Sequence, residues 1–470
     1  MASPKILLVF THRPKKEITW PYKGYDYERR GNELTKKLED GCPGINFVPV
    51  HIHDTREAED LVNKRINEFD GILVYMLGIW TGRTGEEKKE VTLPRVASAP
   101  EVIARSGKPT IIVDDLFGGS GELYTVFPNV RNDGFPVIGL AYSRFRDVID
   151  VVKLFKVIKQ MGETKILLIT DKDAEAADQT PDIPKYSAKV KELFGAEVIR
   201  MDAEQLNDYY VNASEEKAEE LADKWIDGAV RVMEPTRDEI VKSAKMHLAL
   251  KKAMRDVGAD AVTVDCLGLK YSGKLPAFPC LSFFQMNNEG LTGVCQADLR
   301  STVTQLLVRY LTKEMTGKAR PGYVSNPVID LSSNQVIYAH CVAPNKVFGA
   351  EGPENPYIIR SHAEDGEGAS VQSLMPLGEE VTTVQIDLIG KIMAIHQGRS
   401  AANICEEKGC RTKLAVEANV RKIFENGGLN ITGSKKGAWG WHRVTVYGDW
   451  RKQLMNLAIL LGMDVFEEDK

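Results

Sequence analysis

The sequence predicts an α/β fold in which two doubly wound, Rossmann-like or flavodoxin-like domains precede a C-terminal β-barrel domain. Short apolar runs alternate with amphipathic stretches in the first third of the chain, and the alternation restarts near residue 165. From about residue 322 the runs are short, closely spaced and separated by Gly, Pro and Asn, which is typical of an antiparallel sheet. A chain of 470 residues is also too long for one ordinary core.

The first predicted domain, residues 1–160, contains buried parallel strands. Its apolar runs are uninterrupted, as expected of strands that helices cover on both faces. The carboxyl ends of such strands face the ligand crevice, so the loops that follow them should carry binding residues. The strand runs lie at 6–10, 72–76, 110–113 and 137–140, with helix-like segments at 29–38 and 58–68.

Three residues of these loops, His12, Arg13 and Trp80, are predicted to contact a substrate. No Gly-x-Gly-x-x-Gly motif follows the first strand, so we expect no dinucleotide cofactor that would explain them. An exposed indole in such a loop either stacks on a sugar ring or covers a subunit contact, and the sequence leaves both alternatives open.

The second predicted domain covers residues 161–320 and the third covers residues 321–470. In the second, Thr236 and Glu239 form a capping box that starts a helix reaching about residue 257. In the third, closely spaced strand runs predict a barrel, which the helix at 450–461 follows. The strand runs lie at 165–170, 197–200 and 261–264 in the second domain, and at 336–341, 357–362, 381–386 and 391–396 in the third.

Composition limits the partners and the compartment. The net charge of −5 leaves no concentrated basic surface for nucleic acid. No stretch of eighteen apolar residues occurs and the apolar run near the N-terminus is too short for a signal sequence, so we expect a cytoplasmic protein without a membrane partner. Most of the seven cysteines, an odd number, lie in apolar runs, which suits reduced thiols.

An acidic residue and two histidines from distant parts of the chain form the best candidate site. Asp298 stands just before a predicted helix, whereas His340 and His442 belong to the barrel region. Folds assemble divalent-metal sites and acid–base sites from separate elements in this way. In the alternative interpretation, each polar group only caps a helix or pairs within its own domain.

Four short motifs carry a resemblance to a known family. Two α/β domains and a barrel with these motifs resemble the L-fucose and L-arabinose isomerase superfamily, and are closest to its fucose-isomerase-related branch, which has a fucose isomerase C-terminal domain-like region. The motifs are Asn-Asn-Glu-Gly at 287–290, Cys-Gln-Ala-Asp at 295–298, Ala-His-Cys at 339–341 and Trp-His at 441–442.

The resemblance implies an aldose–ketose isomerase that uses a divalent metal, manganese in this family. Two carboxylates and a histidine hold that ion, which polarises the sugar carbonyl. Asp298 matches the metal aspartate, His442 matches the late metal histidine, and His340 matches the histidine of the arabinose-type strand motif. Arg360, His362 and Trp441 lie in the barrel region that lines the family's cleft, so we expect them to contact the sugar.

Two departures from the family pattern change the expected chemistry. Gln296 stands where the family has a glutamate, and a carboxamide neither takes a proton nor neutralises a cation. The first metal carboxylate has no match, because Lys270 and Lys274 occupy its expected place. A lysine there opposes a cation and could act as an acid–base group. The catalytic candidates are Gln296, Asp298, His340 and Lys270.

Three functions are consistent with these residues. The leading hypothesis is isomerisation of a sugar, and the second is hydrolysis or elimination on a sugar derivative, with the metal weakened or absent. The third is an inactive sugar-binding protein, which Gln296 favours. The family places its cleft between subunits, so the resemblance implies a homo-oligomer, trimeric or hexameric.

Overall fold

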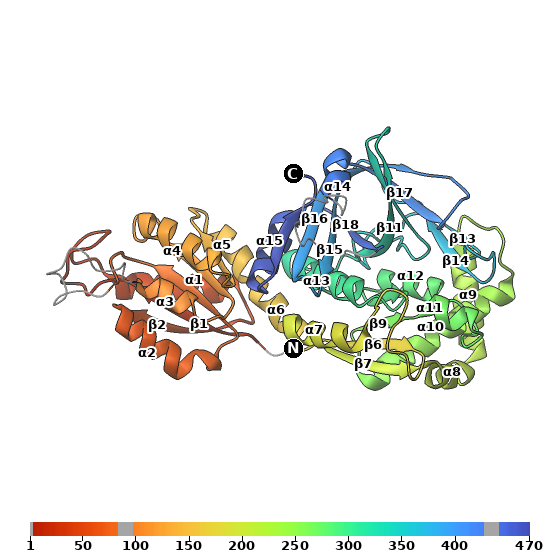
Figure 1. Ribbon diagram of the computed structural model, residues 1–470, viewed down its shortest axis with the longest axis horizontal. Coiled ribbons are helices and arrows are strands. Elements are labelled where there is room, and N and C mark those ends of the chain that lie inside the picture. Colours follow the sequence, from red (N-terminus) through yellow and green to blue (C-terminus); the bar gives the residue numbers. More distant parts are fainter. Residues whose placement is uncertain (1–2, 83–96, 427–440) are drawn as a thin grey trace. The chain divides into compact units, whose positions relative to one another are not determined.

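The computed structural model describes residues 3–82, 97–426 and 441–470 (Figure 1). The chain divides into two compact units. The first contains residues 1–160 and 455–463, and the second contains residues 161–454 and 464–470. The division into three domains stays a prediction.

The first unit is built on a parallel five-stranded sheet with the order β2-β1-β3-β4-β5. This is a doubly wound order, and it confirms the predicted parallel α/β architecture. The sequence did not predict β2, an edge strand that contains Pro49 and fully buries only Phe47 and Ile52. The strands are β1 (Lys5–Thr11), β2 (Asn46–Ile52), β3 (Gly71–Met76), β4 (Thr110–Asp114) and β5 (Val137–Leu140).

Helices cover this sheet through apolar side chains. One buried cluster joins β1, β3 and β4 to α2, α3 and α4, while α1 packs against α5. The Asp26 and Asp54 carboxylates cap the first turns of α1 and α2. The helices are α1 (Tyr27–Gly41), α2 (Thr55–Arg65), α3 (Ala99–Ala104), α4 (Ser120–Asn132), α5 (Phe145–Val152) and α6 (Leu154–Gly162).

The second unit begins with another parallel sheet, whose order is β10-β9-β6-β7. The predicted capping box of Thr236 and Glu239 is confirmed at the start of α10. The strands are β6 (Lys165–Thr170), β7 (Glu197–Asp202), β9 (Ala261–Val264) and β10 (Thr292–Cys295). The helices are α7 (Ile183–Phe194), α8 (Ala203–Val211), α9 (Glu215–Gly228), α10 (Arg237–Val257), α11 (Cys266–Tyr271), α12 (Cys280–Asn288) and α13 (Leu299–Thr316).

The predicted barrel is confirmed as a closed ring of six antiparallel strands in the order β15-β18-β11-β12-β17-β16, which the β15–β16 pairing closes. A short seventh strand, β19 (Asp464–Glu467), pairs in parallel with β16. The six are β11 (Tyr323–Asp330), β12 (Gln335–His340), β15 (Glu380–Asp387), β16 (Ile392–Asn403), β17 (Thr412–Glu417) and β18 (Arg443–Tyr447), and the neighbouring helices are α14 (Val420–Asn426) and α15 (Arg451–Leu460).

One predicted barrel strand lies outside the ring. The run at 357–362 forms β13 (Tyr357–Arg360), which pairs with β14 (Ser370–Ser373) and β8 (Arg231–Val232) in a separate three-stranded sheet. Tyr357 and Ile359 are buried against α9, α10 and α12 rather than in the barrel interior. An apolar strand run alone does not specify which sheet it joins.

A buried charged network, which the sequence did not predict, joins the barrel to the C-terminal segment. The Glu468 carboxylate is fully buried, with Oε1 accepting from the Arg443 guanidinium at 3.1 Å and Oε2 lying 2.7 Å from His396 Nδ1. The phenol of Tyr338 hydrogen-bonds the other nitrogen of His396. Burial would raise the pKa of Glu468, but Arg443 and His396 outweigh it and lower that pKa to about 2.

No described helix is long and apolar enough to cross a membrane.

The Glu468→Gln variant should unfold more easily, by about 3–5 kcal/mol at pH 7, because it removes the buried negative charge that Arg443 and His396 contact. A carboxyl whose pKa falls from 4.5 to about 2 on folding stabilises the fold above pH 4.5. That contribution is lost as the pH falls from 4.5 toward 2, so urea unfolding should show the wild type and the variant converging there. Glu425→Gln, which removes a loose surface pair with Lys422, is the control and should cost under about 0.5 kcal/mol. Equal effects of the two substitutions at pH 7 would contradict the account.

Candidate active site

Asp298 is fully buried at the N-terminus of α13, directly after β10 and a two-residue loop. Its Oδ1 accepts from the backbone N–H of Ser301 at 3.1 Å. Its Oδ2 accepts from the Ser301 hydroxyl at 2.5 Å and from His442 Nδ1 at 2.8 Å. Burial would raise the pKa of Asp298, but the His442 hydrogen bond and charge, with Arg300 and Ser301, lower it below its ordinary value. The carboxylate is therefore ionised and committed to the helix cap and to one imidazole.

The loop before Asp298 has a strained backbone. Gln296 and Ala297 both have positive φ, 64° and 48°, a region that residues with a side chain seldom adopt. The segment 178–180 holds this conformation: the Gln179 backbone N–H donates to the Gln296 carbonyl and the Thr180 hydroxyl donates to the Ala297 carbonyl. These two hydrogen bonds hold the strained loop, and the loop in turn positions Asp298 at the start of α13.

Two buried histidines, His442 and His340, lie next to Asp298 in sequence of contact: His442 bonds Asp298, and His340 lies beside His442. His442 is buried just before β18, and its Nε2 has no hydrogen-bond partner among the described residues. The ring of His340, at the end of β12, lies 5.4 Å from that of His442 between centroids. Burial, followed by the neighbouring imidazoles, holds the pKa of His340 well below its ordinary value, so this ring is neutral. Leaving a buried polar atom without a hydrogen bond costs about 1–3 kcal/mol, so His442 Nε2 is a candidate contact for a bound ligand.

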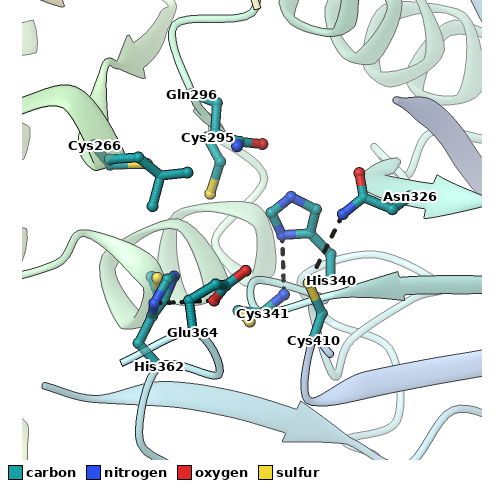
Figure 2. Close-up of a pocket in the computed structure, with 11 residues that line it drawn as sticks. Cys266, Cys295, Gln296, Asn326, His340, Cys341, His362, Glu364 and Cys410 are labelled. Carbon is teal, nitrogen blue, oxygen red and sulfur yellow. Dashed lines mark hydrogen bonds and ion pairs between the residues drawn. The ribbon is translucent and has the colours of Figure 1, made fainter. Parts of the chain in front are cut away.

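His340 also lines a small pocket, where Cys295 and Asn326 flank it (Figure 2). The cavity measures about 30 Å³, enough for one or two water-sized groups but not for a sugar ring. Five of the seven cysteines line it, a gathering that the sequence did not reveal: Cys266, Cys280, Cys295, Cys341 and Cys410. All seven cysteines are free, and burial holds the pKa of Cys295 well above its ordinary value, so that residue remains a thiol.

Gln296 and His362, both predicted from the sequence, lie at this same pocket. The Gln296 amide donates to the Asp178 carboxylate at 2.6 Å. His362 stacks on Phe278 with 4.2 Å between ring centroids, and its Nδ1 lies 3.1 Å from Glu364. The structure therefore brings Gln296, His340 and His362 together from three separate segments.

The other predicted residues of this unit do not line the pocket beside His340. The Lys270 ammonium lies 5.6 Å from the centroid of the Phe278 ring, whereas the Trp441 side chain is largely exposed. The Arg360 guanidinium is buried and occupied by Glu234, Gln372 and Glu407. Arg360 thus ties β13 to neighbouring segments, and its sugar contact stays a prediction.

The predicted residues of the first unit share the carboxyl edge of its sheet. His12 is buried and stacked on Tyr27, and its Nε2 lies 2.8 Å from His51 Nδ1. Burial is the main cause that lowers the pKa of His12 to about 4. The Arg13 guanidinium pairs with Glu17 and donates to the Trp80 carbonyl at 3.3 Å, while the Trp80 indole is exposed.

The donors that the resemblance assigns to manganese do not fit a three-ligand site as they are arranged. Hydrogen bonds from Ser301 and His442 occupy both oxygens of Asp298, and the Gln296 amide is bound to Asp178. Within residues 3–82, 97–426 and 441–470, no three His, Cys, Asp or Glu side chains lie where they could hold a metal ion. The manganese stays a prediction, and we derive no reaction step through it.

Two acids at this sheet edge, Asp178 and Asp265, were not among the predicted site residues, although the sequence placed Asp265 at the expected ligand edge. Asp265 directly follows β9, so its position after a buried strand was a usable signal. Its pKa is raised, first by burial and then by the charge of Asp178, and its Oδ1 is buried without a hydrogen-bond partner. Asp178 lies in an irregular segment between β6 and α7, where no sequence pattern marks it.

Comparison with known proteins relates the chain to sugar isomerases. No protein-family model matches it. Sulfoquinovose isomerases of Priestia aryabhattai and Priestia megaterium are 24% identical to it over 320 residues, which are 67% of this chain and 66% of each relative. The chain thus matches just under two thirds of the length of these relatives. This similarity supports a relationship to sugar isomerases without singling out the fucose-isomerase branch.

A solved structure, that of a two-component system response regulator/GGDEF domain protein, is 14% identical and covers 56% of this chain and 82% of its own. Its TM-score of 0.23 is too low to support any inference.

The Gln296→Glu variant should destabilise the loop before α13 by about 1 kcal/mol near neutral pH, because it replaces the donor to Asp178 by a second acceptor. Combining it with Asp178→Asn restores one amide and one carboxylate, so the double variant should regain most of the loss. Urea unfolding of the two single variants and the double variant measures this coupling. Strictly additive effects would show that the amide–carboxylate contact does not form.

Proposed function

We propose that this protein is an aldose–ketose isomerase that acts on a sugar or sugar derivative. The observation that carries the proposal is the buried Asp298–His442 pair with the second imidazole of His340 beside it. An ionised carboxylate that fixes an imidazole is a common arrangement for moving protons, and isomerisation requires a proton to move between neighbouring carbons. The similarity to sulfoquinovose isomerases supports the same reaction class.

The substrate class follows from the relatives and from the pocket. The relatives' names identify sulfoquinovose as their substrate, and we propose that compound as the first sugar to test here. The cavity beside His340 admits only one or two water-sized groups, so the carbonyl end of an open-chain sugar fits better than a closed ring. L-Fucose and L-arabinose come next, because the motifs around Asp298 and His340 resemble those of enzymes for these sugars.

The purified full chain should convert at least one of sulfoquinovose, L-fucose and L-arabinose into its ketose, with proton NMR as the measurement. His442→Gln should lower kcat/KM by roughly 100- to 10,000-fold, the usual contribution of a positioned acid–base group. The matched control is His247→Gln, since His247 is equally buried but bonds Ser282 on α12. Release of a free sugar from a glycoside, without ketose formation, would replace isomerisation by hydrolysis. Binding of a sugar without turnover would indicate an inactive binding protein.

We also propose a closed homo-oligomer, trimeric or hexameric. Large apolar side chains are exposed at the carboxyl edge of the first unit's sheet, among them Trp20, Trp80 and Phe117. Trp80 and Phe117 also have positive φ, 65° and 71°, so their exposure is maintained against backbone strain. Such aromatic groups are typical anchors of interfaces and of sugar sites.

Light scattering at micromolar concentration should give three or six times the chain mass, and Trp80→Asp should lower it, because a buried interface rejects an unpaired charge. Val211→Asp is the control, since Val211 is also an exposed apolar residue but lies on α8 of the second unit. A fully active monomeric wild type would refute the assembly.

A further inference from the structure

Hydrogen bonds hold His340 and His442 in opposite tautomers. The Cys341 backbone N–H donates to His340 Nδ1 at 2.9 Å, and a nitrogen that accepts carries no proton. The proton of neutral His340 is therefore on Nε2. The Asp298 carboxylate accepts from His442 Nδ1 at 2.8 Å, so that nitrogen carries a proton, and the neutral form of the ring presents a lone pair at Nε2. One Nε2 is a donor and the other is an acceptor.

The acceptor is unsatisfied. His442 Nε2 is buried and has no hydrogen-bond partner among the described residues, so a bound group that supplies hydrogen would satisfy it. The donor faces the small pocket that His340 lines with Gln296 and His362 (Figure 2). The ring centroids are 5.4 Å apart, so the two imidazoles are direct neighbours in the site.

We propose that His340 and His442 form an acid–base pair that moves the sugar proton without a metal ion, and that Asp298 is a positioning residue rather than a metal ligand. This inference rests on the proposed isomerase function. The Asp298 oxygens already accept three hydrogen bonds, from Ser301 and His442, so their role is to hold the cap and the imidazole.

The proton transfers balance within the substrate and the pair. His442 Nε2 takes the proton from C2 of the open-chain aldose, the electron pair forms the C1=C2 bond, and the carbonyl pair moves to O1. The His340 Nε2–H holds the resulting O1 anion, in the way that a neutral imidazole polarises a carbonyl. The proton of the O2 hydroxyl passes to O1, the C2=O2 bond forms, and His442 returns its proton to C1 to give the ketose. No oxidant, reductant or other reactant is required.

A metal ion on His442 Nε2 is the competing arrangement. Histidines that bind metals commonly donate their other N–H to a carboxylate, as His442 does to Asp298. The two arrangements differ in a measurable way. Added Mn²⁺ would broaden the ring signals of His442 if the ion binds there, and would leave them unchanged if the ring is a free base.

Nitrogen NMR of the full chain labelled with ¹⁵N-histidine tests the pair without any substrate. Long-range ¹H–¹⁵N spectra of metal-stripped protein, assigned with His340→Gln and His442→Gln, should show the Nε2–H form for His340 and the Nδ1–H form for His442. Asp298→Asn should move the His442 proton to Nε2 and lower turnover on the order of 10,000-fold, the loss typical when the carboxylate behind a catalytic imidazole is replaced. His247→Gln should change neither the two tautomers nor turnover.

Two results would overturn the inference: reversed tautomers in the wild type, or turnover that disappears on metal removal and returns with Mn²⁺. Turnover that survives metal removal, verified by elemental analysis, supports it. A chain with the expected tautomers that isomerises no sugar overturns the proposed function and, with it, the reaction assigned to the pair. Failure of the pair alone is thereby distinguished from failure of the function.

Discussion

The contact between the Asp298 carboxylate and the His442 imidazole is the interaction on which the site depends. It joins the start of α13 in the α/β part of the second unit to the start of β18 in the barrel, and both side chains are buried. A buried carboxylate is tolerated only when it is fully hydrogen-bonded, and here the helix cap at Ser301 and the imidazole supply the donors. The same contact fixes the tautomer of His442. One hydrogen bond therefore both joins the barrel to α13 and fixes the position of the His442 proton.

Much of the fold could be predicted because burial leaves a direct pattern in the chain. Strands covered on both faces are uninterrupted apolar runs, so β1, β3, β4, β6 and β9 were found near their true positions. β2 was missed, because an edge strand that contains Pro49 and has few fully buried residues does not show that pattern. β13 was found as a strand but placed in the wrong sheet, since its apolar residues would suit either the barrel or the helices that it covers.

The candidate site was less accessible from sequence, because its chemistry lies in contacts between distant segments. Position before a predicted helix pointed to Asp298, whereas the motifs that resemble the isomerase family pointed to His340 and His442. The partner of each ring nitrogen depends on the backbone of Cys341 and on a 144-residue separation between Asp298 and His442. The gathering of five cysteines at the pocket likewise follows from the sheet and the barrel meeting there, and no spacing in the sequence encodes it.

The candidate site differs from the pattern of the isomerase family that the sequence resembles. A fold positions groups at strand ends, but the chemistry depends on which groups stand there. The Gln296 amide is bound to Asp178 and the Asp298 oxygens accept from Ser301 and His442, so these donors, which the resemblance assigns to a metal ion, are already engaged. The site also contains two imidazoles whose hydrogen bonds place a proton on Nε2 of His340 and on Nδ1 of His442. In the proposed mechanism, a neutral donor facing the carbonyl oxygen and a base beside the neighbouring carbon meet the main electrostatic need of enolisation, so catalysis would not depend on carboxylate ligands.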